Sequence, residues 1–115
     1  MKQLRRVFLT LMLLPAAAAF AAGGSGEYEL DWPVAGETLA YRSCGCGDAC
    51  WVAQVRDTAN GEAKATLSCD CEALFYALGG AEKQPLSESC EAINQSEHKA
   101  GQISDRLQQL LGQGR

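Results

Sequence analysis

The sequence lacks most of the short motifs that mark an active site. It has no G-x-S-x-G turn for a nucleophilic serine and no glycine-rich loop that would hold a phosphate after a strand. Its one histidine, His98, has no evident orienting partner, and its carboxylates are scattered along the chain rather than paired. We therefore expect a protein that is not an enzyme, with no catalytic residues.

Excess basic charge is also absent. Ten lysines and arginines face 14 aspartates and glutamates, so the formal net charge is −4 at pH 7. An acidic surface repels phosphate backbones and anionic lipid headgroups. We expect neither nucleic acid nor a membrane surface as a partner, whereas a cationic protein partner would suit this surface.

No apolar run is long enough to cross a bilayer, which takes roughly 20 residues. The run at 7–14 is shorter, and it follows Lys2, Arg5 and Arg6 in the three-part layout of a secretory signal peptide. Ala19-Phe20-Ala21 fits the small-x-small cleavage rule. We expect 1–21 to be cleaved as a signal peptide, which places the mature chain in the periplasm or outside the cell.

The stretch "RRVFL" raises a second export route. It resembles a twin-arginine signal, although Leu4 and Thr10 depart from that pattern. A very short basic segment before a strongly apolar core suits ordinary export of an unfolded chain, which we favour. Twin-arginine export stays as the alternative.

The chain left after cleavage suffices for one small domain. Loss of the three basic signal residues takes the formal charge from −4 to −7, because 1–21 contains no acidic residue. Residues 22–26, "AGGSG", predict a flexible N-terminal segment. We expect a single α+β domain over 27–115, in the manner of a small bacterial envelope protein.

Six cysteines lie in this exported part, and we expect all of them to form disulfides. They are Cys44, Cys46, Cys50, Cys69, Cys71 and Cys90. An even count in a small exported chain is typical of a disulfide framework. Two C-x-C pairs could instead surround zinc or copper(I), but the paired C-x-x-C spacing of common zinc sites is missing. We therefore expect no metal and no cofactor.

Alternating polar and apolar residues predict short strands near 27–32, 38–44, 50–57 and 64–71. Asn60-Gly61 is favoured in a two-residue type I′ hairpin turn, which would place Ala59 opposite Glu62. Residues 72–80, "EALFYALGG", fit either a further strand or a short helix that ends at Gly79-Gly80, and 81–89 fit a loop.

The predicted hairpin register selects one disulfide. Counting outward from the turn places Cys50 opposite Cys71, at a position where Cα atoms approach to about 4.5 Å. A longer loop would place Cys50 opposite Cys69 instead. We favour Cys50–Cys71 and leave the other four cysteines unassigned, except that one must reach Cys90 if the helix is tied to the sheet.

From Ser87 the pattern becomes helical. Apolar residues that share one face are Ile93, Ala100, Ile103, Leu107 and Leu110. This stripe predicts a helix on the core, with a coiled-coil partner as the alternative. The predicted fold is an antiparallel meander of about four strands, covered on one face by the C-terminal helix. Trp32, Trp51, Phe75 and Tyr76 are expected in the core rather than in a ligand platform.

The function that these observations favour is a non-enzymatic protein-interaction module. Its partner is unidentified, and it would act as an inhibitor or an accessory subunit through a rigid, cross-linked surface. The alternative is a metal-handling or thiol-redox protein that uses the C-x-C pairs.

Overall fold

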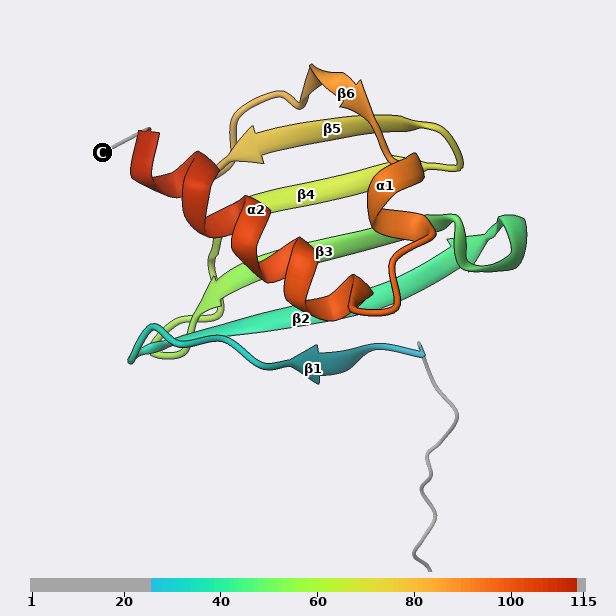
Figure 1. The fold of residues 1–115 in the computed structure, drawn as a ribbon. Helices are drawn as coiled ribbons and strands as arrows, with labels where there is room; N and C mark the ends of the chain where they lie inside the picture. Colours follow the sequence, from blue (N-terminus) through green and yellow to red (C-terminus); the bar gives the residue numbers. More distant parts are fainter. Residues whose placement is uncertain (1–25, 114–115) are drawn as a thin grey trace, which may run out of the picture.

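The computed structural model describes residues 26–113, in which one antiparallel sheet carries helices on a single face (Figure 1). The sheet strands are β1 Tyr28–Leu30, β2 Glu37–Gly45, β3 Cys50–Asp57, β4 Ala63–Asp70, β5 Ala73–Leu78 and β6 Gln84–Ser89. A short 3₁₀ turn, η3, spans Cys46–Asp48, and the helices are α1 Glu91–Asn94 and α2 Lys99–Gln113. The predicted signal peptide at 1–21 and residues 22–25 of the predicted flexible segment lie outside the described residues.

The strands follow one another in chain order from β1 to β6, so the predicted α+β meander with a covering C-terminal helix is confirmed. Within residues 26–113 the sheet has six strands rather than about four. The additional strands are β5, which the sequence left open between strand and helix, and β6, which it predicted as a loop. None of the helices described is long and apolar enough to span a membrane.

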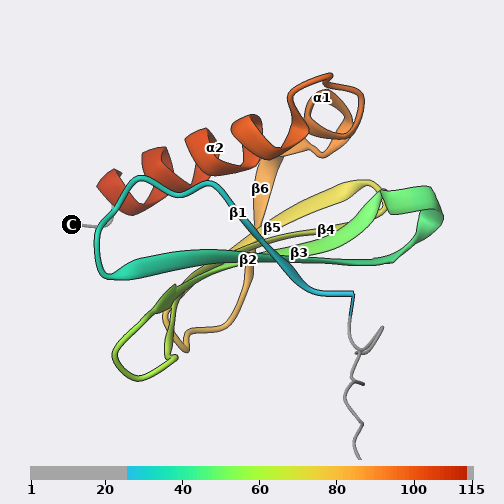
Figure 2. The same ribbon diagram turned by 90° about the horizontal axis from the view of Figure 1, so that it is seen from below.

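The core lies between the sheet and α2. In β3, Trp51, Ala53 and Val55 are fully buried and alternate with more exposed residues, as the period of two predicted. Their cross-strand neighbours on β4 are Cys69, Leu67 and Ala65, which are buried on the same face. Figure 2 shows α2 lying across this face, while the opposite face of the sheet carries no described helix.

The hairpin between β3 and β4 differs from the prediction. The Asp57 amide donates to the Glu62 carbonyl (2.9 Å), so four residues, rather than two, form the loop. The predicted type I′ turn needs a positive φ at both Asn60 and Gly61. Only Gly61 has one, at 74°. The Asn60 side chain instead accepts a hydrogen bond from the Glu62 amide (2.9 Å), an Asx-type turn that stabilises the longer loop.

The predicted Cys50–Cys71 disulfide is wrong. The disulfides are Cys44–Cys50, Cys46–Cys71 and Cys69–Cys90, and they include all six cysteines. The longer loop and a β-bulge beyond Val55 shift the register, so that Cys50 pairs with Asp70. A one-residue shift turns a side chain to the other face of a sheet. Cys71 also leaves the strand with a φ of 87°.

The helical region is interrupted, contrary to the single stripe predicted from Ser87. Ile93 is buried in α1, and a turn at 95–98 separates it from α2. The Ser96 hydroxyl accepts a hydrogen bond from the His98 amide (2.9 Å), a local bond that competes with helix continuation. As a result Ala100 is exposed rather than on the core face, whereas Ile103, Leu107, Leu110 and Leu111 are buried.

Candidate functional site

The chain after β1 rises from the sheet and runs beside α2 (Figure 2). Two adjoining hollows lie where these segments meet, and we call them together the seam. The first, the Trp32 hollow, has a volume of about 420 Å³, and the second, the Tyr28 hollow, about 320 Å³. Ala100 of α2 lines both hollows. The seam is therefore one surface built from an edge strand, its following loop and one side of α2.

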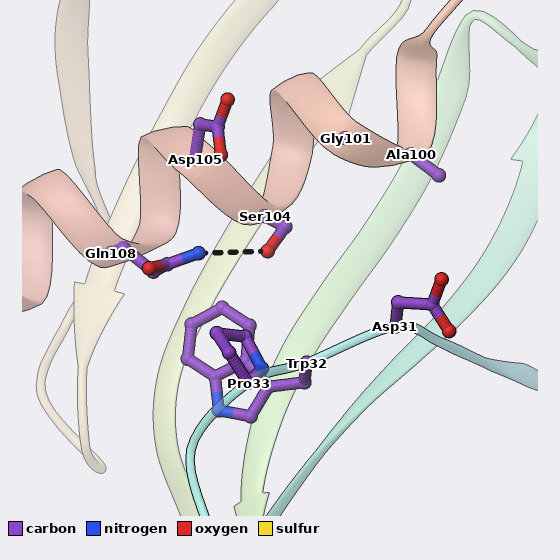
Figure 3. A pocket seen from close by; sticks show the side chains of 8 residues that line it. All are labelled: Asp31, Trp32, Pro33, Ala100, Gly101, Ser104, Asp105 and Gln108. Carbon is purple, nitrogen blue, oxygen red and sulfur yellow. Dashed lines mark hydrogen bonds between the residues drawn. The ribbon is translucent and has the colours of Figure 1, made fainter.

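In the Trp32 hollow, the Trp32 ring faces a stretch of α2 that carries small side chains (Figure 3). Its lining residues are Asp31, Trp32, Pro33, Ala100, Gly101, Ser104, Asp105 and Gln108. Gly101 has no side chain, and a Cβ built there would meet nothing within 4 Å, so space remains above the helix backbone at this point. The hollow can accept a side chain from outside without rearrangement of α2.

Hydrogen bonds hold the walls of this hollow in place. The Trp32 indole Nε1 donates to Glu37 Oε1 (2.9 Å), and Glu37 Oε2 accepts from Lys64 Nζ (2.7 Å). On the helix side, Gln108 Nε2 donates to Ser104 Oγ (3.1 Å; Figure 3). Because these bonds restrict the side chains before anything binds, little conformational entropy remains to be lost on binding.

The Tyr28 hollow is bordered by two aromatic rings tilted against each other and by a hydrogen-bonded tyrosine hydroxyl. Tyr28 is 57% exposed, and its ring centroid lies 5.4 Å from that of the buried Tyr41. The Tyr41 hydroxyl donates to Asp48 Oδ1 (2.6 Å). Lys99, at the start of α2, donates through Nζ to the Asp48 carbonyl oxygen (2.6 Å) and to Oδ2 (3.0 Å). Asp48 therefore joins the sheet, the η3 loop and α2.

Electrostatics at this junction follow from its hydrogen bonds. The hydrogen bond from Tyr41 holds the pKa of the Asp48 carboxyl below its ordinary value of 3.8; burial opposes this shift, and the hydrogen bond from Lys99 supports it. Burial, followed by the hydrogen bond to Asp48, raises the pKa of Tyr41. Asp48 is therefore an anion and Tyr41 a neutral donor throughout the physiological pH range.

The loop that carries Asp48 has an unusual backbone. Cys46, Gly47 and Asp48 have consecutive positive φ values of 54°, 60° and 74°. Left-handed conformations cost energy for residues other than glycine. The Cys44–Cys50 and Cys46–Cys71 disulfides close this loop against β3 and the end of β4, so covalent cross-links offset that cost. The loop thus forms a fixed support for Asp48.

The seam carries carboxylates that have no ionic partner among residues 26–113. Four carboxylates each form an ion pair with a lysine or arginine: Glu27, Glu37, Asp48 and Glu88. By contrast, Asp31, Glu97 and Asp105 line the seam without an ion pair to any described residue. Lys99 is the cation of the seam, and Asp48 neutralises it. The seam therefore has an excess of negative charge.

Two further hollows flank α1. One, of about 450 Å³, is lined by Ala49, Cys71, Glu72, Ser89, Glu91, Asn94 and Gln95, and the other, of about 370 Å³, lies between β6, α1 and α2. Neither has an aromatic side chain in its lining. The seam alone among these hollows combines aromatic rings, unpaired carboxylates and a sheet edge, so it is the best candidate site.

The residues singled out from the sequence are placed as follows. All six cysteines are disulfide-bonded, so both C-x-C pairs lack free thiols in this structure. Trp51 is fully buried as expected, whereas Trp32 is half-buried and also lines the seam. His98 is exposed in the turn before α2. Over residues 26–113, no group of three or more histidines, cysteines or carboxylates is placed to hold a metal ion.

No family model, curated protein or solved structure matches this chain. The function has to be argued from the seam itself. Sequence reasoning missed the junction of Tyr41, Asp48 and Lys99, because Lys99 lies 51 positions beyond Asp48 and no local pattern connects them.

Proposed function

We propose that the protein is a periplasmic or secreted, non-enzymatic interaction module that binds another protein through the seam. The observation that carries the proposal is the pair of adjoining hollows between β1 and α2, with exposed aromatic surface and unpaired carboxylates. Aromatic side chains are enriched at protein interfaces because they bury a large area and lose little side-chain entropy.

The three disulfides suit this role, because they indicate an oxidising compartment and restrict the scaffold around the seam. A rigid surface retains more of its interaction energy as affinity. Such a module would act as an inhibitor or as an accessory subunit of a larger envelope assembly.

Site-specific photo-crosslinking in intact cells tests the proposal. A benzophenone amino acid replaces Tyr28 in one variant and Leu78 in the other; both are large, exposed apolar residues, at 57% and 45%. We expect a discrete protein adduct from position 28 and none from position 78, because Leu78 lies on β5, away from the seam. Failure to form an adduct at 28, or an equal yield at both positions, would overturn the proposal.

A further inference from the structure

We propose that the seam takes an extended, basic segment of the partner, which adds to the free edge of β1 as a further strand. A lysine or arginine of that segment enters the Trp32 hollow, where Asp31 and Asp105 supply the opposite charge. The inference rests on the proposed function and names the chemistry of the partner.

The edge of the sheet is the first argument. Among the described strands β1 pairs only with β2, which leaves one row of β1 backbone groups directed away from the sheet. Such a row is a template for an added strand. The other edge strand, β6, is less suitable, because it contains Pro85, pairs irregularly with β5 and turns away from the plane of the sheet (Figure 2).

The charge pattern of β1 is the second argument. Glu29 lies within β1, and Glu27 and Asp31 flank the strand, so acidic residues alternate along this segment. Glu27 is paired with Arg56, whereas Glu29 and Asp31 have no ionic partner in the described part of the chain. A second copy of β1 would bring like charges opposite one another, which is unfavourable. A basic strand avoids this repulsion, so the charge pattern disfavours self-association and favours a cationic partner.

The position of the Trp32 hollow is the third argument. Side chains of a strand alternate between its two faces, so every second residue of an added strand would face α2 and the hollow. The hollow's volume of about 420 Å³ accommodates a long side chain. An arginine or lysine there would lie near the Trp32 ring, which attracts cations, and near two carboxylates. Charge and shape therefore favour the same ligand.

Peptide binding to the intact mature protein provides the test. The probes are fluorescent heptapeptides: one of alternating lysine and valine, one of alternating glutamate and valine, and a basic one with two central valines replaced by proline. We expect the first to bind, with an affinity that falls as salt rises. The acidic peptide should not bind, and the proline peptide should bind at least about tenfold more weakly, because proline cannot donate to a strand ladder.

Two matched variants locate the binding site. Gly101→Lys places a cation in the Trp32 hollow, and Gly112→Lys makes the same charge change near the end of α2. Both glycines are exposed and helical, and an added Cβ meets nothing within 4 Å at either, so both variants should fold. We expect Gly101→Lys to weaken binding of the basic peptide at least about fivefold and Gly112→Lys to leave it nearly unchanged. Asp31→Asn should weaken it about two- to fivefold, the range for an exposed ion pair.

Equal loss in the two lysine variants, or equal binding of the proline peptide, would show general charge attraction and overturn the inference. Absence of any binding by the basic peptide would overturn it too. The proposed function fails separately, because it depends on the crosslink from position 28. A protein adduct there without binding of the basic peptide would remove the inference and leave the interaction module standing.

Discussion

At the scale of single residues, Asp48 connects the cross-linked loop to the rest of the molecule. Its carboxylate accepts hydrogen bonds from Tyr41 and Lys99, and Lys99 also lies 5.7 Å from the ring centroids of Tyr41 and Trp51. Its φ of 74° is one that asparagine tolerates better than most residues. Asp48→Asn is therefore a variant that removes the charge with little change in backbone or volume.

We predict that Asp48→Asn lowers stability at neutral pH and flattens its acid dependence. The folded-state pKa of Asp48 is depressed below 3.8, so its contribution is present above that value and is lost as pH falls through the folded pKa. Urea midpoints measured from about pH 6 to about pH 2 should therefore fall less steeply in the variant than in the wild type. Glu27→Gln is the comparison, because a side-chain hydrogen bond, here from Arg56, also depresses the pKa of Glu27. An unchanged acid slope in Asp48→Asn would contradict the prediction.

At the scale of elements, the sequence predicted β3 well because one face of that strand is buried and the other is not. It failed where a side chain, rather than periodicity, determines the backbone. Asn60 favours the longer hairpin loop by accepting from Glu62, and Ser96 ends the α1 region by accepting from His98. β6 shows no clear alternation, and its pairing depends on β5, so its sequence alone does not distinguish it from a loop.

Leu107 tests whether α2 is part of the core. Its side chain is fully buried between α2 and the sheet, so we predict that Leu107→Ala lowers the free energy of unfolding by about 2–4 kcal/mol. Leu78→Ala is the matched control, because Leu78 is 45% exposed and its truncation should cost far less. Urea denaturation followed by circular dichroism measures both. A similar small loss in the two variants would place α2 outside the cooperative core.

At the scale of the whole molecule, three disulfides at one end of the sheet link its strands to the η3 loop and to the start of α1. Domains of this size bury a modest fraction of their surface, so cross-links contribute much of their stability. The sequence predicted this framework from an even cysteine count, but not its connectivity. The pairing follows from a one-residue register shift and the positive φ of Cys71, which depend on tertiary structure. The seam could not be predicted from the sequence either, because its two sides are β1 and α2, at opposite ends of the described chain.

The three disulfides differ in burial, and we predict that they are reduced in two stages. Cys44 and Cys46 are exposed, and their partners Cys50 and Cys71 are half-buried, whereas Cys69 and Cys90 are 1% and 0% exposed. Thiol–disulfide exchange needs access for the attacking thiolate. A mild reductant acting on the folded protein should therefore open Cys44–Cys50 and Cys46–Cys71 first. Cys69–Cys90 should open only when the protein unfolds.

Alkylation of the folded, partly reduced protein, followed by peptide mapping, measures this order. Cys69–Cys90 links β4 to the start of α1, so its replacement by a pair of alanines should cost about 3 kcal/mol, the value expected for a loop of this length. Opening the two exposed disulfides should instead release the η3 loop, and with it Asp48, while α2 stays packed on the sheet. Early alkylation of Cys69 and Cys90 would show that α1 leaves the sheet more readily than its buried cystine indicates.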